Sequence, residues 1–399
     1  MSFIAPAGTP LRLTEIASGM WASTRSDSLT ELHQELARRA QVEHCWSFSS
    51  GRAAMVVALR AMQAVDGGKR TRVVIPGYTC YSVAAALENC GLTPVLADID
   101  PATLTYDPGS LERALRGDAL AVITANLYGI PNDTPAIESA ARAAGAYLLD
   151  DAAQSLGASV GGRPAGGFGD VGLYSFDKGK NIPTMQGGAL VARKSALSAE
   201  LQRQWTLLPT PAPAETFMNA GKLAAYSLLL EPSRFGFARS LPGLKLGQTP
   251  YELTYPITRY SASLAGLAVR LARRIEEFNA TRIANAQRLR EALADSSLQQ
   301  IAPPAGASPV YLRLPVLTRS SGQRLRLINA LEQAGIGATA SYPQALGDVP
   351  EVRARLAADS PETPGAREVA ARILTLPTHA YCPADMAERV RDIVRRAAE

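Results

Sequence analysis

The chain has 399 residues, of which 47% are hydrophobic and 19% are charged, and this balance excludes a disordered chain. Its 41 Lys and Arg residues against 36 Asp and Glu residues leave a net charge of only +5. The Arg residues are scattered along helical stretches rather than clustered, so we expect no nucleic-acid partner. The 3 His and 4 Cys residues show no metal-ligand spacing, so we expect no metal site and reduced thiols in a cytoplasmic protein. We also expect no export signal. The most apolar stretch, 223–230, is too short to span a bilayer, so we expect no stable membrane insertion.

The first half of the chain alternates helix-like stretches with short apolar runs bounded by Gly, Pro and Asp. The predicted helices are 53–63, 82–89, 108–114 and 135–143, and the predicted strands are 73–75, 94–97, 119–125, 147–149, 171–176 and 189–192. Continuous apolar strands joined by helices are typical of strands buried on both faces. The pattern therefore predicts an α/β fold, a three-layer sandwich with a mostly parallel central sheet.

The second half of the chain changes character at residue 209. Six prolines surround one apolar helix in 209–255, which we interpret as an irregular, Pro-rich excursion. A long helical stretch (261–293), a strand (310–317), a helix (324–333) stopped by Gly335 and two late helices follow. We therefore expect an N-terminal arm and large domain in residues 1–255 and a smaller C-terminal α+β domain in residues 256–399.

Three segments carry residues suited to chemistry. The first, 49–55, is a Ser-Gly-Arg turn that enters a helix, and the N–H groups at a helix N-terminus can hold a phosphate. Ser50 could equally serve only as the helix N-cap.

The second segment, 150–154, begins with two carboxylates at the end of an apolar strand, where open α/β sheets bind ligands. A buried carboxylate there needs a cationic partner such as a protonated heterocyclic nitrogen, although one of the two Asp residues could simply cap a helix.

The third segment, 175–181, carries Lys180 on a loop just after a buried strand. A partly desolvated lysine amine is a nucleophile toward carbonyl groups. A solvated surface lysine is the alternative for this segment taken alone.

Together these segments resemble the pyridoxal-phosphate (PLP) sugar aminotransferases of the DegT/DnrJ/StrS group, which have PLP fold type I, the aspartate aminotransferase-like fold. The segment 50–54 is similar to the family's S-G-T-A-A turn, and 126–129 stands where the family has H-L-Y-G. Segment 150–154 resembles E-D-A-A-Q, 175–181 resembles S-F-x-x-x-K-N, and 373–377 resembles a late L-x-L-P stretch. The ordered set is specific, whereas each element alone is weak.

The resemblance implies a role for each matching position. Lys180 would bond covalently to PLP and then move a proton between substrate and cofactor, and Asp151 would keep the pyridine nitrogen protonated. Gln154 would lie near the ring. Ser175 would hold the phosphate together with the turn formed by Ser50, Gly51 and Arg52.

Three departures from the family pattern leave the cofactor chemistry better supported than the identity of the substrate. Arg52 replaces a usual Thr, so its guanidinium would either contact the phosphate or turn outward. The family's ring-stacking aromatic falls at or beside Cys80, so Tyr78 or Tyr81 would take its place. The family's N-Y-R segment has no clean counterpart around 255–260.

The resemblance implies an aminotransferase that carries an amino group from a donor, with glutamate favoured, to a keto sugar. The favoured sugar is nucleotide-linked, the expected pathway is the synthesis of a polysaccharide or a glycosylated metabolite, and the expected assembly is a homodimer. One alternative is a non-sugar ketone as substrate: a cyclitol, an amino-acid-derived ketone or a carrier-bound ketone. Another is a catalytically silent PLP-fold regulator.

Overall fold

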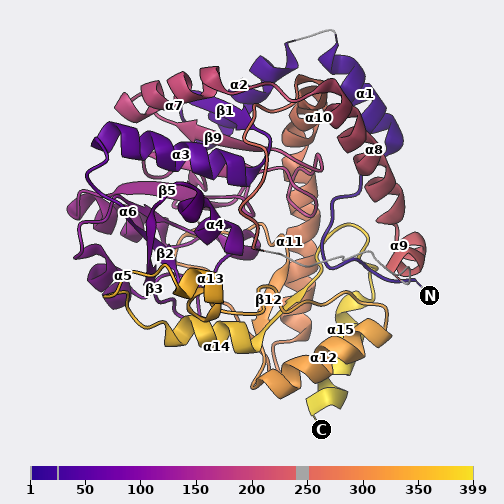
Figure 1. Cartoon of the computed structure of the whole chain (residues 1–399). Helices are drawn as coiled ribbons and strands as arrows, with labels where there is room; N and C mark the ends of the chain where they lie inside the picture. The colour runs from indigo at the N-terminus through magenta and orange to yellow at the C-terminus, as the bar shows by residue number, and fades with distance from the viewer. Residues whose placement is uncertain (1, 25–26, 240–250, 399) are drawn as a thin grey trace.

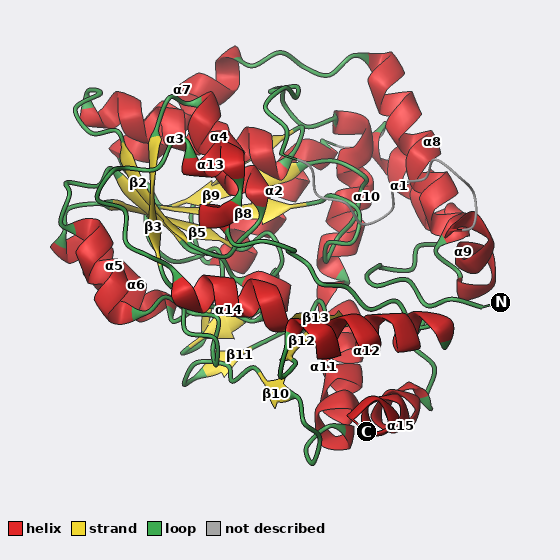
Figure 2. Cartoon of the chain, turned by 60° about the horizontal axis from the view of Figure 1, so that its bottom comes forward, coloured by secondary structure: helices red, strands yellow, loops and turns green. Residues whose placement is uncertain are grey.

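A seven-stranded sheet forms the centre of the larger part of the molecule (Figure 2). The computed structural model describes residues 2–24, 27–239 and 251–398. The strands are β1 (His44–Phe48), β2 (Arg72–Pro76), β3 (Thr93–Ala97), β4 (Ala121–Ile123), β5 (Tyr147–Asp151), β8 (Val171–Ser175) and β9 (Gly188–Ala192). Their order is β1-β9-β8-β5-β4-β2-β3, and only β9 runs against the others. The predicted α/β fold with a mostly parallel sheet is confirmed, and β1 is a strand that the sequence pattern did not reveal.

Helices cover both faces of this sheet and complete the three layers. One face carries α3 (Gly51–Asp66), α4 (Tyr81–Asn89) and α7 (Ala196–Leu207). The other face carries α2 (Ser28–Ala40), α5 (Pro108–Leu115), α6 (Thr134–Ala143) and α10 (Ala262–Arg273). Neighbouring strand residues point to opposite faces: Val73 packs with α3 and α4, whereas Val74 packs with α5 and α6. The continuous apolar runs therefore serve two cores at once.

A smaller unit packs at the end of the molecule that holds the C-terminus (Figure 1). Its three strands pair in the order β10 (Gln299–Gln300), β12 (Leu314–Leu317) and β13 (Ile373–Leu376). Its helices are α11 (Ile275–Ala292), α12 (Ser321–Gln333), α13 (Pro350–Arg353), α14 (Pro364–Arg372) and α15 (Met386–Ala398). Gly335 follows α12 with φ +75°, which agrees with its predicted role as a helix stop. Three two-residue strands, β6 (Ser159–Val160), β7 (Arg163–Pro164) and β11 (Ala307–Ser308), and two short 3-10 turns, η1 (Leu127–Gly129) and η2 (Leu346–Asp348), complete the described elements.

The region between the two units is more helical than the sequence predicts. Within the expected irregular excursion 209–255, α8 (Pro213–Leu229) and α9 (Pro232–Arg239) occupy most of the described residues, and 240–250 lie outside the described part. Prolines 213 and 232 begin these helices, because a helix tolerates proline in its first turn. Helix α8 lies beside α1 (Leu13–Ser23) and α10 (Figure 1).

Two element boundaries also differ from the predicted ones. The stretch 261–293 is broken at Arg274, whose φ of −104° and ψ of 9° separate α10 from α11. The strand predicted at 310–317 begins only at Leu314, after Tyr311 adopts a φ of +45°. The domain division at residue 255 stays a prediction; α10 packs on α1 and α2, whereas α11 packs on α15.

Candidate active site

The predicted site residues gather where the parallel strands end. Ser50 follows β1, Tyr78 follows β2 and Asn126 follows β4, while Asp151 and Ser175 are the last residues of β5 and β8. Strands β5 and β8 are direct neighbours, and Asp151 pairs in register with Leu173. Carboxyl ends of parallel strands meet at one edge of a sheet, which is where α/β proteins bind their ligands.

The N-terminus of α3 forms a cradle for an anion. The Ser50 hydroxyl accepts a hydrogen bond from the Ala53 amide (3.0 Å), so Ser50 is an N-cap and stands at the cradle at the same time. A Cβ atom on Gly51 would lie 3.1 Å from Ser175 Cβ and 3.2 Å from Ser175 Oγ, so the hydroxyl of Ser175 faces the first turn of the helix. The N–H groups of that turn have no intrahelical partner and carry partial positive charge, which suits a phosphate.

Arg52 turns its side chain away from this cradle. Its Nη1 lies 2.7 Å from Glu252 Oε2, and its guanidinium carbon lies 4.8 Å from the centre of the Tyr255 ring. Of the two orientations that the sequence left open, the structure has the outward one. The expected contact of the guanidinium with a phosphate is therefore not supported, and only the backbone amide of Arg52 stays at the cradle.

The two neighbouring Asp residues have different environments. Asp150 is fully buried and accepts hydrogen bonds from Asn126 Nδ2 (2.7 Å), Thr124 Oγ1 (3.0 Å) and the Gly166 amide (2.6 Å). Asp151 is only partly buried, and its Oδ1 accepts one hydrogen bond, from the Ala153 amide (3.0 Å). Its Oδ2 has no hydrogen-bond partner among the residues that the structure describes. Asp150 is thus a structural residue, and Asp151 keeps an oxygen for a ligand.

Burial controls the charge of Asp151. It raises the pKa of this carboxyl to about 6, while the Ala153 amide and the positive charge of Lys180 oppose that rise. The electrostatic effect shows that Lys180 and Asp151 share one site, although they are 29 positions apart. Lys180 is partly buried rather than exposed to bulk solvent. Burial disfavours the ionised form of Asp151, and a cationic ring nitrogen beside the carboxylate would stabilise that form.

The N-terminal arm holds the loop that carries Lys180. The Thr9 hydroxyl donates to the Lys180 carbonyl oxygen (3.1 Å) and accepts from Arg282 Nη2 (2.6 Å). Arg282 is 2% exposed and has no carboxylate partner within the described ranges, and burial lowers its pKa to about 10. The same arm pairs with the smaller unit through Ile4 and Ile336. The arm therefore connects the smaller unit to the backbone of Lys180.

Gln154 is held by tyrosines from both units. Its Oε1 accepts from the Tyr128 amide (3.0 Å), and its Nε2 donates to the Tyr342 hydroxyl (3.1 Å). The hydroxyls of Tyr78 and Tyr128 lie 3.0 Å apart, and the Tyr81 hydroxyl accepts from the Gln344 amide (3.1 Å). The rings of Tyr78 and Tyr81 both lie 6.0 Å from the ring of Tyr342, so the two expected aromatics flank a third. Which of them would stack on a cofactor stays a prediction.

Arg313 adds an unpaired cation beside this tyrosine cluster. Its backbone N–H donates to the Tyr128 carbonyl (3.3 Å), and its Nη1 donates to Thr339 Oγ1 (3.2 Å). Burial raises the pKa of Tyr128 and Tyr342, and the charge of Arg313 partly offsets both rises. No carboxylate pairs with Arg313 in the part of the chain that is described.

Several residues of the site were missed by sequence reasoning. Thr9, Arg282, Arg313 and Tyr342 come from the arm and the smaller unit, where no motif marks them. Tyr128 stood within the recognised segment 126–129, so its place in the family pattern was a usable signal. Within the described residues no cluster of three or more His, Cys, Asp or Glu side chains is arranged to hold a metal ion.

An anion cradle, a partly buried carboxylate and a lysine on one sheet edge define the class of the site. This set fits a cofactor with a phosphate, a basic ring nitrogen and a carbonyl carbon, as PLP has. The fold is that of the fold type I PLP aminotransferases, and the residues present fit their cofactor.

The chain belongs to the DegT/DnrJ/EryC1/StrS aminotransferase family, which it matches at residues 9–226 and 245–395. It is 26% identical to a UDP-N-acetyl-3-dehydro-alpha-D-glucosamine 3-aminotransferase of Acidithiobacillus ferrooxidans, over 92% of this chain and 87% of that protein. It is 29% identical to an L-glutamine:2-deoxy-scyllo-inosose aminotransferase of Micromonospora echinospora, over 76% and 67%. The crystal structure of the aminotransferase TlmJ from Streptoalloteichus hindustanus has the same fold, with a TM-score of 0.79 at 23% identity over 99% of both chains.

Replacing the lysine tests the centre of the site. Lys180→Ala protein mixed with PLP should lack the absorbance band at roughly 420 nm that lysine-bound cofactor gives. Lys178→Ala is the matched control, because Lys178 is exposed on the same loop and should keep the band. A band of normal intensity in Lys180→Ala would assign the covalent bond to another amine.

The raised pKa of Asp151 predicts that this residue destabilises the cofactor-free protein. Its folded-state pKa of about 6 exceeds the ordinary value of 3.8, so the folded state binds the proton more tightly and stability falls as the pH rises between these values. Without cofactor, Asp151→Asn should therefore be more stable than wild type near pH 8 by about 3 kcal/mol, and the difference should shrink to below about 1 kcal/mol near pH 4.

Urea unfolding at both pH values measures this difference. Added PLP should reverse the order near pH 8, because only the carboxylate can pair with a cationic ring nitrogen. Equal stability of the two cofactor-free proteins near pH 8 would contradict the assigned environment of Asp151.

Proposed function

We propose that this protein is a PLP-dependent aminotransferase that moves an amino group from an amino-acid donor, with glutamate as the first candidate, to the ketone of a nucleotide-linked sugar. The product would serve the synthesis of a polysaccharide or a glycosylated metabolite. The observation that carries the proposal is the position of Lys180 close enough to the partly buried Asp151 for its charge to oppose the raised pKa of that carboxyl, beside an anion cradle.

The residues of the chain divide the work of binding and proton transfer. The α3 N-terminus and the Ser175 hydroxyl would hold the phosphate, and the free Oδ2 of Asp151 would pair with the ring nitrogen. When bound, PLP supplies a carbonyl carbon that takes up amino groups and a ring that withdraws electrons. Lys180 would hold that carbon through its Nζ and would carry a proton to and from the substrate carbon. Gln154, fixed at both ends of its amide, restricts the space over the ring.

The substrate assignment is supported by the relatives. The similar protein of Acidithiobacillus ferrooxidans is named for a UDP-linked keto sugar, and several relatives are named GDP-perosamine synthase. A cyclitol ketone is the second candidate, because other relatives are named for 2-deoxy-scyllo-inosose. A silent regulator is disfavoured, since Lys180, Asp151 and Ser175 are all retained.

Arg313 supports an amino acid as the donor. A partly buried guanidinium without a carboxylate partner is a ready site for the carboxylate of a ligand. Its charge acts on Tyr128 and Tyr342, which contact Gln154. In this proposal Arg313 binds a carboxylate of glutamate while the amino group lies near Lys180.

We also place the enzyme in the cytoplasm as a homodimer. The four cysteines are free thiols, which suits a reducing compartment. No helix within the described residues is both long and apolar enough to cross a membrane. The dimer follows from the resemblance to fold type I enzymes.

A half-reaction assay tests the proposed function directly. Protein loaded with PLP and mixed with glutamate should lose the band at roughly 420 nm as the cofactor takes up the amino group. Keto sugars linked to UDP, GDP or TDP, and then cyclitol ketones, should restore the band when they accept that group. Restoration by a cyclitol alone would favour the second candidate, and no loss of the band with any amino acid would contradict an aminotransferase.

Arg313→Gln tests the donor site separately. The variant should keep its cofactor band but need about 100-fold more glutamate for the half-reaction, because a charged bidentate contact is lost. Arg319→Gln is the matched control, since Arg319 is exposed beyond the far end of the same strand. An unchanged glutamate requirement in Arg313→Gln would assign the donor carboxylate to another residue.

A further inference from the structure

Arg282 is a buried cation whose hydrogen-bond partners are all uncharged. It lies on α11, is 2% exposed, and keeps its charge at neutral pH because its pKa is about 10. Its guanidinium donates to Thr9 Oγ1 (2.6 Å), Asn279 Oδ1 (3.3 Å) and the Gly8 carbonyl oxygen (3.4 Å). Burying a charge without a counter-ion costs stability. This cost indicates that the guanidinium serves the site and not the stability of the fold.

The chemistry of the guanidinium decides the direction of the hydrogen bonds at Thr9. A guanidinium can only donate, so the Thr9 hydroxyl must accept from Arg282. Its single proton is then directed to the carbonyl oxygens of Lys180 and Asn181, which lie 3.1 Å and 3.3 Å from Thr9 Oγ1. A charged donor at the start of such a chain strengthens the bond that follows it. Thr9 thus passes the hold of Arg282 to the backbone of Lys180.

A second route leads from Arg282 to the same loop through Asn279. Asn279 Oδ1 accepts from Arg282 Nη1 and from Asn181 Nδ2, at 3.3 Å each. The other end of this amide, Nδ2, donates to the Leu156 carbonyl oxygen (2.9 Å), two residues after Gln154. Arg282 therefore lies at the junction of two loops of the site, the one that carries Lys180 and the one that carries Gln154.

The backbone of Lys180 is held on both sides of its Cα atom. Its N–H donates to the Asp177 carbonyl oxygen (3.1 Å), and its own carbonyl oxygen accepts from Thr9. The conformation of the backbone limits the directions that a side chain can take. The arm that carries Thr9 is itself fixed to the smaller unit, where His379 Nε2 lies 2.7 Å from the Ala5 carbonyl oxygen.

We propose that Arg282 is a positioning residue for Lys180: acting through Thr9 and Asn279, it holds the lysine backbone in place for the reaction of the amine with the cofactor. Arg282 itself touches neither cofactor nor substrate in this account. The inference rests on the covalent role proposed for Lys180 and does not depend on which donor or ketone the enzyme uses. The alternative is a purely structural role, in which Arg282 joins α11 to the arm without any effect on the amine.

Three single variants test the positioning role. Thr9→Val removes the hydroxyl while keeping the shape of the side chain, Arg282→Met removes the charge and its donors, and Thr9→Ser keeps the hydroxyl. Mixed with PLP, Thr9→Val and Arg282→Met should form the band at roughly 420 nm about 10-fold more slowly than wild type, because the amine is no longer held. Thr9→Ser should form the band at nearly the wild-type rate.

A double variant shows whether the two residues act in series. Thr9→Val combined with Arg282→Met should form the band no more slowly than Arg282→Met alone, because Thr9 transmits the effect of Arg282. Two independent effects would multiply to a loss of about 100-fold. That larger loss, a slow Thr9→Ser variant, or wild-type rates in the other single variants overturns the proposal.

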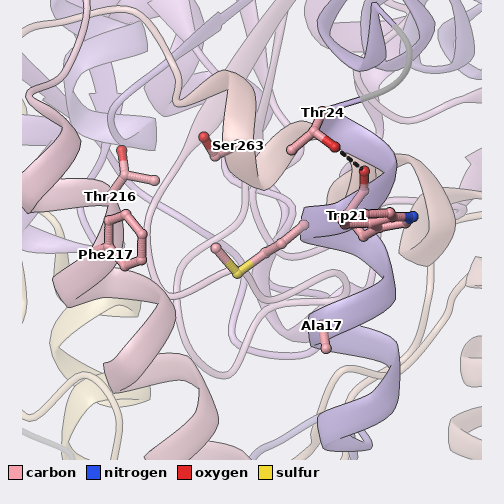
Figure 3. A pocket seen from close by; sticks show the side chains of 7 residues that line it. Ala17, Trp21, Thr24, Thr216, Phe217 and Ser263 are labelled. Carbon is pink, nitrogen blue, oxygen red and sulfur yellow. Dashed lines mark hydrogen bonds between the residues drawn. The ribbon is translucent and has the colours of Figure 1, made fainter.

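Thr216→Val and Arg288→Met are the matched controls. Thr216 is 7% exposed, and it lines a pocket between α1 and α8 (Figure 3), where its hydroxyl lies 3.0 Å from Ser261 Oγ. Arg288 lies six residues beyond Arg282 on α11, is exposed, and donates to Asn285 Oδ1 (3.4 Å). Both variants should form the band at the wild-type rate.

Hydrogen–deuterium exchange of the cofactor-free proteins gives a readout that does not depend on PLP. In Thr9→Val and Arg282→Met, amides in the loop 177–184 should exchange at least about 10-fold faster, while those of β5 and β8 keep their wild-type rates. Faster exchange throughout the molecule would show a general loss of stability and would support the structural alternative. A wild type that gives no band with PLP contradicts the proposed function, whereas a normal wild-type band with unaffected variants contradicts this inference alone.

Discussion

The site depends on one electrostatic constraint, the negative charge of Asp151 held partly buried within range of the Lys180 amine. Burial opposes that charge and raises the pKa of the carboxyl to about 6, so the carboxylate needs a cation, and Lys180 meets this need only in part. Asp150 takes the buried structural position and satisfies its oxygens within the protein. This separation of roles leaves Asp151 with an oxygen for a ligand, at a cost in stability that a bound cationic ring would offset.

The two units of the molecule contribute different parts of the chemistry. The large sheet brings together the groups for the cofactor: the α3 N-terminus, Ser175, Asp151 and Lys180. The arm and the smaller unit add Thr9 and Arg282, which hold the lysine loop, and Arg313 and Tyr342, which lie beside Gln154 and Tyr128. In the proposed function, cofactor chemistry rests on strand ends that the family pattern describes, whereas substrate choice rests on contacts between the units.

Sequence reasoning succeeded where neighbouring residues decide the structure. The parallel strands, the N-cap at Ser50 and the helix stop at Gly335 follow from local patterns, and all of them are present. It failed where a local signal has two meanings. Prolines 213 and 232 suggested irregular chain because they interrupt helices, but they can also begin them.

The amino-acid sequence by itself determined the order of the motifs, the parallel sheet and the residue types available for a PLP site, because each depends on residues close together in the chain. Only the tertiary structure decided the outward turn of Arg52, the hydrogen bond of Thr9 to Lys180, and the tyrosines around Gln154. These contacts join positions up to 200 residues apart. Their distances depend on how the helices and the two units pack, and no local pattern of residues encodes that packing.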